Sequence, residues 1–205
     1  MNKAVEEALV QERKVIVGII EGSPIPTFVI NRKHEVIFWN RACEELTGFA
    51  AGDMIGTDRH YMPFYGTKRP LIADLIVDQD IVSLEKLYGS KRVRKSVKVE
   101  GAYEARDFYI DLGGQSRHLY FLAAPIYDEQ GEIIAAIETL QDVTRERVME
   151  LSLKEHAENI REELEKNITL RKTIEGIIEG SPIPMFVIGK DHNIMFWNRA
   201  FTELS

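Results

Sequence analysis

The chain has 205 residues, 44% hydrophobic and 29% charged, which is the balance of an ordinary globular protein and excludes a disordered, collagen-like or membrane-spanning chain. With 26 Lys and Arg against 33 Asp and Glu, the net charge of −7 disfavours binding to nucleic acid or to an anionic membrane surface. The basic stretch 91–95 is therefore predicted to be a solvated loop. A single cysteine, Cys43, excludes a disulfide framework, and no secretory leader is visible, so we expect a cytoplasmic protein.

An internal repeat organises the sequence. Residues 13–47 align with residues 171–205 at an offset of 158 positions, and 23 of the 35 aligned pairs are identical. The second copy stops where the first continues. We therefore expect residues 181–205 to be the truncated start of a second domain, in a sequence taken from a longer protein.

A helix and a hairpin open the first copy. The apolar spacing in residues 1–21 predicts a helix, which Gly22 followed by Pro24 would end. Two apolar runs, 27–30 and 35–39, are rich in β-branched and aromatic residues and flank a polar turn, which predicts a β-hairpin.

Two helices and three strands are predicted next. Residues 40–47 predict a short helix that Gly48 ends, and Pro70 is expected at the first position of another helix. Three later apolar runs, separated by glycine-rich or polar turns, predict strands. These runs are residues 105–112, 118–126 and 133–141.

A long helix is predicted to follow the last strand. Residues 145–180 contain no proline, and their apolar residues keep a heptad spacing that Asn167 and Arg171 interrupt. This pattern predicts a connecting signalling helix with coiled-coil character.

Two motif-bearing segments resemble a PAS domain over residues 22–144. FVINRKHEVIFWNRACEELTGFAAGDMIG (28–56) is similar to the opening hairpin and first helix of that family. YFLAAPIYDEQGEIIAAIETLQDVT (120–144) ends in Asp142-Val143-Thr144, like the Asp-Ile-Thr signature of the family. The segment 57–75 also resembles a subgroup found in bacterial and archaeal histidine kinases and related signalling proteins.

The resemblance implies an α+β fold with a five-stranded antiparallel sheet, helices on one face and long signalling helices on either side. It also implies a sensory or dimerisation module whose concave sheet face, closed by the middle helices, can hold a ligand. The partial repeat implies a second PAS domain downstream in the same chain.

Six side chains fall where PAS proteins place the wall of their cavity. Aromatic walls with a few polar groups are suited to a small ligand, because they bury its surface and orient it by hydrogen bonds. The alternative is that the rings simply fill the core and Arg69 lies in solvent at a helix start. The six candidates are His60, Tyr61, Phe64, Tyr65, Arg69 and Asp74.

The sequence does not identify a cofactor. His60 could ligate haem iron, as a histidine in this region does in some relatives, but one unsupported histidine favours a capping or surface role. Cys43 does not lie in the Asn-Cys-Arg-Phe-Leu-Gln motif of flavin photosensors, so no flavin photocycle is expected. No cluster with the spacing of metal ligands is visible.

Signal relay is expected at the end of the last strand. Asp142 could pair with Arg145 or Arg147, or accept hydrogen bonds from amides at the helix start, and Thr144 stands beside it. An ordinary helix cap is the alternative for these residues, and the resemblance favours the relay role for Asp142, Thr144 and Arg145.

The preferred interpretation is a sensory PAS module that relays a signal to a downstream PAS domain and output domains of a protein of the histidine-kinase type. A ligand-free dimerisation spacer is the structural alternative. A phosphotransfer fragment with a phospho-accepting His156 is the third, although its surroundings lack the usual proline. No catalytic constellation is visible, so we expect no enzymatic activity in this chain.

A homodimer is the expected assembly. Along the strand 118–126, one alternating set of side chains can face the core, but the set formed by Tyr120, Leu122 and Ala124 is apolar too. We expect the flanking helices and a partner chain to cover this second face.

Overall fold

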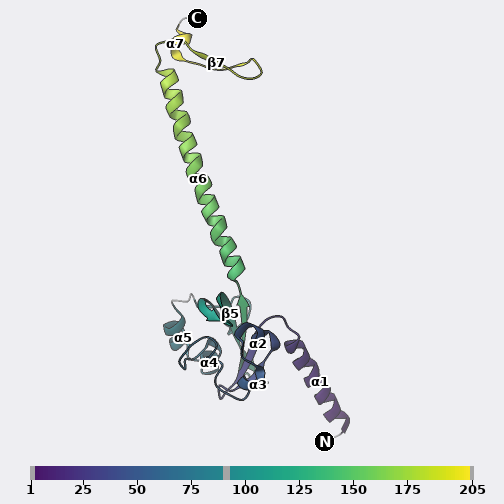
Figure 1. The fold of residues 1–205 in the computed structure, drawn as a ribbon. Coiled ribbons are helices and arrows are strands. Elements are labelled where there is room, and N and C mark those ends of the chain that lie inside the picture. Colours follow the sequence, from purple (N-terminus) through teal and green to yellow (C-terminus); the bar gives the residue numbers. More distant parts are fainter. Residues whose placement is uncertain (1–2, 90–92, 204–205) are drawn as a thin grey trace. The chain divides into compact units, whose positions relative to one another are not determined.

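The computed structural model describes residues 3–89 and 93–203. The chain divides into two compact units with the boundary between Arg147 and Val148. The first unit begins with helix α1 (Lys3–Glu21) and contains the larger sheet (Figure 1). None of the helices described is long and apolar enough to cross a membrane.

A six-stranded antiparallel sheet forms the frame of the first unit. Its strands are β1 (Thr27–Asn31), β2 (Val36–Trp39), β3 (Arg94–Lys95), β4 (Tyr103–Leu112), β5 (Gln115–Tyr127) and β6 (Ile133–Asp142). Their order across the sheet is β2-β1-β6-β5-β4-β3. The first hairpin therefore pairs with the last strand, and Phe28 lies opposite Glu138.

Four short helices lie between β2 and β3 in the chain. They are α2 (Arg41–Thr47), α3 (Ala51–Met54), α4 (Ile72–Val77) and α5 (Ile81–Tyr88). Helix α4 contacts β1, β5 and β6, and five of its six residues are buried. The core lies between these helices and the inner face of the sheet, where Phe28, Phe121 and Leu140 are at most 3% exposed.

Helix α2 illustrates how the local sequence determines where a helix begins and ends. Asn40 caps its start, and Gly48 ends it in the left-handed conformation with φ 79°, which a glycine adopts without steric cost. Gly113, in the turn before β5, also has a positive φ, and a Cβ there would lie 2.5 Å from the Leu46 carbonyl oxygen. Only glycine fits this close approach.

Asn40 is also the joint between α1 and the sheet. Its amide group donates to the carbonyl oxygens of Ile20, Ser23 and Ile25. Its carbonyl oxygen accepts the N–H groups of Thr27 and Cys43, each at 2.9 Å. One fully buried side chain thus holds the end of α1, the start of β1 and the start of α2.

The second unit repeats this joint. It contains most of α6 (Thr144–Glu179), then β7 (Phe186–Ile188), β8 (Ile194–Trp197) and α7 (Arg199–Thr202). Asn198 donates to the carbonyl oxygens of Ile178, Ser181 and Ile183 and accepts the N–H groups of Met185 and Phe201.

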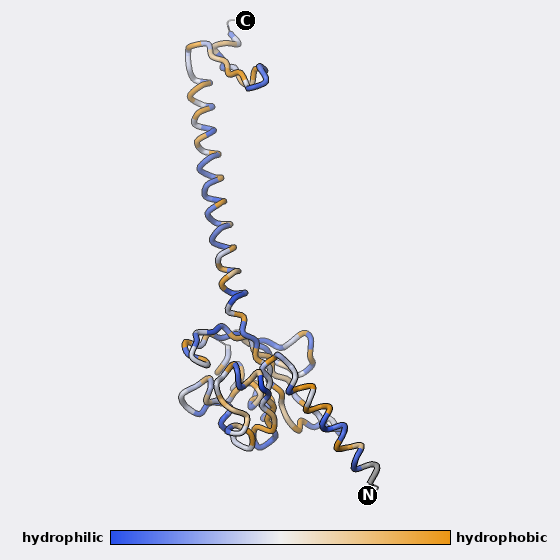
Figure 2. The backbone as a smooth tube through the Cα atoms, turned by 45° about the vertical axis from the view of Figure 1, so that its right-hand side comes forward, coloured by the Kyte–Doolittle hydropathy of each residue, from blue (hydrophilic) through white to orange (hydrophobic). Residues whose placement is uncertain are grey.

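Apolar side chains remain exposed outside the core. In Figure 2, hydrophobic residues recur among hydrophilic ones along α1 and α6. On α1, Ile16 is 52% and Ile19 is 68% exposed, and in the second unit Trp197 is 52% exposed. These surfaces are available for contacts that the single chain does not make.

Several predictions about the elements are confirmed. The N-terminal helix ends at Glu21, just before Gly22, the first hairpin forms as expected, and helix α2 occupies residues within 40–47. The three later strands are also present, each one to four residues longer than predicted.

Other predictions about the elements are wrong. Pro70 is not the first residue of a helix: α4 starts at Ile72, because the Asp74 carboxylate accepts the Leu71 N–H and begins the helix there. The basic stretch is exposed at Arg94 and Lys95, as predicted, but these residues form the edge strand β3 rather than a loop and make the sheet six-stranded. Lys91 and Arg92 lie outside the described residues. Helices α3 and α5 were not predicted.

Replacing Asn40 by Ala should lower the free energy of unfolding by about 2–4 kcal/mol, because the variant leaves the buried N–H groups of Thr27 and Cys43 without an acceptor. Urea unfolding followed by near-UV circular dichroism measures this loss. The matched control is Asn167→Ala on the exposed surface of α6, where we expect a change within about 0.5 kcal/mol. Equal effects of the two substitutions would contradict the role of Asn40.

Candidate functional site

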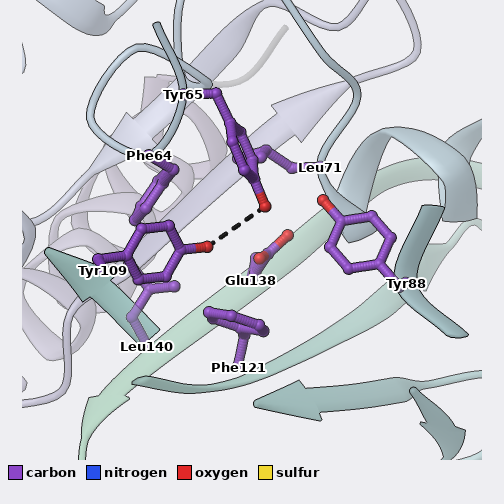
Figure 3. A pocket seen from close by; sticks show the side chains of 8 residues that line it. All are labelled: Phe64, Tyr65, Leu71, Tyr88, Tyr109, Phe121, Glu138 and Leu140. Carbon is purple, nitrogen blue, oxygen red and sulfur yellow. Dashed lines mark hydrogen bonds between the residues drawn. The ribbon is translucent and has the colours of Figure 1, made fainter. Parts of the chain in front are cut away.

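A small interior cavity lies between the inner face of the sheet and the helices. Its volume is about 10 Å³, close to the space of one water molecule. Strands β4, β5 and β6, helix α5 and the segment before α4 supply its walls (Figure 3). The lining side chains are Phe64, Tyr65, Leu71, Tyr88, Tyr109, Phe121, Glu138 and Leu140.

Aromatic rings make up most of the wall. Tyr109 packs edge-on against Phe64, Tyr65 and Phe121, with ring centroids 5.7 to 6.2 Å apart. The hydroxyl groups of Tyr65 and Tyr109 are 3.3 Å apart, and the Tyr88 hydroxyl donates to the Pro70 carbonyl oxygen. Burial raises the pKa of Tyr88 and of Tyr109, so both hydroxyls stay protonated and remain hydrogen-bond donors.

Glu138 supplies the ionisable group of the cavity. It lies on β6 in the middle of the sheet, is 3% exposed and accepts the Ala73 N–H at 2.9 Å. Burial raises the pKa of its carboxyl group to about 8. The hydrogen bond from Ala73 lowers this pKa, and the nearby negative charge of Asp74 raises it. At neutral pH the carboxyl group is therefore mostly protonated, among the rings that Figure 3 shows around it.

Arg69 stacks on two of the cavity's rings without lining the cavity itself. Its guanidinium carbon lies 4.6 Å from the Tyr65 ring centroid and 5.0 Å from that of Tyr88. One terminal nitrogen donates to the Leu87 carbonyl oxygen, while the buried Nε has no hydrogen-bond partner among the described residues.

A larger cleft of about 320 Å³ lies at the surface beside the hairpin turn. The buried Asp74 is part of its wall: one carboxylate oxygen is 2.7 Å from His34 Nδ1, and the other is 2.8 Å from His60 Nε2. The second oxygen also accepts the Leu71 N–H. The cleft is lined by Lys33, His34, Asp58, His60, Tyr61, Lys68, Arg69, Pro70, Asp74 and Asp78.

The histidines keep Asp74 ionised. Burial alone would raise the pKa of the Asp74 carboxyl group, but hydrogen bonds from His60, Leu71 and His34 hold it below its ordinary value. Partial burial works against protonation of His34, yet its contacts with Asp74 and Asp78 raise its pKa above 6.5. A negative charge is thus fixed at the start of α4, one residue from the N–H that Glu138 binds.

A second candidate site joins the sheet to α6. Asp142 accepts the N–H and the hydroxyl of Thr144 and forms an ion pair with Arg117 of β5. The Thr144 hydroxyl oxygen accepts the His118 N–H at 2.8 Å, and the Val143 N–H binds the His118 carbonyl oxygen. Both β5 and β6 are therefore tied to the first turn of α6.

Both copies of the repeat match protein families by sequence. Residues 16–59 match the family described as PAS fold, and residues 172–205 match a family described as PAS domain. Both copies belong to the PAS family. The first unit accordingly has the α+β PAS fold, with six strands in its sheet.

Solved PAS domains of low sequence identity resemble the chain. The PAS domain of Bordetella pertussis BvgS is 17% identical, with a TM-score of 0.43, and the match covers 72% of this chain and 98% of that one. The PAS domain of an HTR-like protein from Haloarcula marismortui is 16% identical, with a TM-score of 0.44 and coverage of 69% and 99%. The comparison with curated proteins gives no match.

The six predicted pocket residues of the PAS domain fall into two groups. Phe64 and Tyr65 line the interior cavity, whereas His60, Tyr61, Arg69 and Asp74 line the surface cleft. Arg69 connects the two groups, because its guanidinium group contacts the Tyr65 ring. It is only partly exposed, so the alternative expectation that Arg69 lies in solvent is wrong. That either space holds a ligand stays a prediction.

The relay residues also differ from expectation in one respect. Asp142 and Thr144 are hydrogen-bonded to each other at the joint, but Asp142 pairs with Arg117 rather than with Arg145 or Arg147. Arg145, in the first turn of α6, is exposed. The basic partner comes from β5, which is the neighbour of β6 in the sheet.

Sequence reasoning missed Glu138, Tyr88, Tyr109 and Arg117. A signal for Glu138 was available, since the alternation of β6 places it on the same face as the buried Ala136 and Leu140. The other three required the tertiary structure, because nothing in their local sequence indicates which elements meet.

The cofactor predictions can be compared with the geometry. His60 is 2% exposed, and its Nε2 is hydrogen-bonded to Asp74 in the wall of the surface cleft, so this nitrogen is not available as a haem ligand. Cys43 is buried in the core. Within residues 3–89 and 93–203, no group of three or more His, Cys, Asp or Glu side chains could hold a metal ion.

The raised pKa of Glu138 makes stability depend on pH. Between its ordinary value of 4.5 and about 8, the folded state keeps the proton and the unfolded state loses it, so Glu138 lowers stability as pH rises through this window. We expect Glu138→Gln to gain stability relative to the wild type over that range, by up to about 1.4 kcal/mol per pH unit.

Urea unfolding at several pH values between 5 and 8 measures this difference, with the exposed Glu85→Gln as the control of equal chemistry. A stability difference that does not change with pH would show that Glu138 is ionised in the folded state.

Proposed function

We propose that residues 22–144 form a sensory PAS domain that relays a signal through α6 to downstream domains of a protein of the histidine-kinase type. The observation that carries this proposal is the hydrogen-bonded joint at Asp142 and Thr144. It binds two strands of the cavity wall, β5 and β6, to the first turn of the helix that leads into the second PAS sequence. A change in the sheet would therefore be transmitted directly to α6.

The polar side chains that line the interior cavity support a sensory role, although the cavity itself is small. A buried acid beside three tyrosines is an unusual combination for a core that serves packing alone, because each polar group costs free energy on burial. These groups offer hydrogen bonds to a ligand that enters by displacing the surrounding rings. The proposal includes no catalytic step and places the protein in the cytoplasm.

The ligand-free spacer remains a second candidate function. The observation that favours it is the small cavity, since about 10 Å³ is far below the few hundred Å³ of an ordinary ligand site. The phosphotransfer alternative has less support: His156 is exposed on α6, and its Nδ1 lies 2.7 Å from the Ser152 carbonyl oxygen of the preceding turn.

The sensory proposal predicts that a small molecule bound in the cavity changes α6. We expect native mass spectrometry of the purified chain to reveal such a molecule. Its presence should raise hydrogen-exchange protection in the first turns of α6 in the wild type. In Asp142→Ala, which loses the acceptor for Thr144, the domain should stay folded and bind the molecule while this protection disappears.

Each outcome distinguishes the candidates. A molecule that binds without altering exchange in α6 of the wild type contradicts the relay. A chain that binds no small molecule under any condition supports the spacer instead.

The proposal also includes a homodimer. Leu119, Phe121 and Ala123 are buried, whereas Tyr120, Leu122 and Ala124 of the opposite face are only partly covered. Together with the exposed apolar residues of α1, this face suits contact with a second chain. Light scattering at tens of micromolar protein should give the mass of a dimer, and Ile19→Glu should shift it towards the monomer; a monomeric wild type would contradict the prediction.

A further inference from the structure

The interior cavity has the electrostatic character of a cation site. Five of its eight lining residues are aromatic and one is a glutamate, and none of the eight is basic. Aromatic rings carry partial negative charge on their faces and attract ammonium and guanidinium groups. Among the lining side chains, Glu138 is the one whose loss of a proton would create a negative charge beside a bound cation.

One cation already stacks on these rings. The Arg69 guanidinium lies over Tyr65 and Tyr88, both of which line the cavity. Arg69 itself is held outside the lining by its hydrogen bond to the Leu87 carbonyl oxygen. The lining around Glu138 and Tyr109 therefore contains no basic side chain that would repel a cation.

Hydrogen-bond acceptors point into the same space. Figure 3 shows the Glu138 carboxyl group among the tyrosines and the Tyr65 and Tyr109 hydroxyls turned towards each other. Hydroxyl oxygens and carboxylates both accept hydrogen bonds from an ammonium group, which has donors only. The volume of about 10 Å³ admits a group the size of one water molecule, which is also the size of an ammonium ion.

From these observations we propose that the cavity binds the ammonium ion, with Glu138 as its counter-ion and the tyrosine rings as its cage. This inference rests on the proposed sensory function and names the class of ligand.

Binding has a defined proton balance. The cation enters with its own protons, and the Glu138 carboxyl group releases one proton to solvent, so that the bound pair consists of a carboxylate and an ammonium group. No bond forms or breaks apart from this O–H bond. The raised pKa of Glu138 means that this proton is present at neutral pH before the cation binds.

Calorimetric titration of the full chain with ammonium chloride tests the proposal. Sodium chloride and potassium chloride at the same ionic strength control for charge and, for potassium, for size. We expect saturable binding of one ammonium ion per chain. The released proton is taken up by the buffer, so the heat of binding should differ between two amine-free buffers that have different enthalpies of ionisation. Methylammonium chloride should bind more weakly, because its second heavy atom exceeds the cavity volume of about 10 Å³.

Variants locate the site. Glu138→Gln should weaken ammonium binding by at least about tenfold, because it removes the counter-ion. Tyr109→Phe keeps the ring and removes one hydroxyl, so a smaller loss of a few-fold is expected. Glu85→Gln, exposed on α5, should bind as the wild type does. Near-UV circular dichroism of each variant establishes that it is folded.

The results separate the ligand class from the function. Equal binding of potassium, or unchanged binding in folded Glu138→Gln, overturns the proposal. If ammonium fails to bind while another molecule binds and raises protection in α6, the ligand class is wrong and the sensory function stands. If no molecule binds, both fail.

Discussion

Two carboxyl groups accept the N–H groups at the start of α4, and much of the PAS domain is arranged around this contact. Asp74 accepts the Leu71 N–H and Glu138 accepts the Ala73 N–H. The first N–H groups of a helix have no partner within it, so a short buried helix needs acceptors from elsewhere. Glu138 lies in the middle of the sheet, and the contact therefore fixes α4 against β6.

The same contact links the surface of the domain to its interior. His34 belongs to the turn between β1 and β2 and helps to keep Asp74 ionised, and the charge of Asp74 contributes to keeping Glu138 protonated. The opposite preferences of the two acids reduce repulsion between them, because only one carries a charge at neutral pH. Burial is the main reason that Glu138 is protonated, and a histidine in a surface turn adds to this effect through Asp74.

The local sequence was sufficient to predict the elements whose ends are determined by a single side chain. Asn40 and Gly48 delimit α2, and their residue types alone indicate a cap and a left-handed end. Pro70 misled the prediction because the true cap of α4, Asp74, acts from inside the helix. The Asp142 partner was also unpredictable, since Arg117 becomes its neighbour only when β5 and β6 pair.

The pocket residues illustrate the same limit. The segment before α4 could be recognised as part of a pocket wall from its aromatic residues. The sequence did not indicate that some of its side chains line the interior cavity and others line the surface cleft. Tyr88 and Tyr109 come from α5 and β4, and only the packing of these elements brings them to Glu138.

Asn40 and Asn198 make equivalent contacts 158 residues apart. In each PAS copy, the hydrogen bonds of this asparagine side chain thus attach the copy to the helix before it. The other end of α6 is fastened by a different set of side chains, at Asp142 and Thr144. Neither fastening uses the central turns of α6. Evolution can therefore lengthen, shorten or exchange this linker, and add further copies in tandem, without redesigning the domains at its ends.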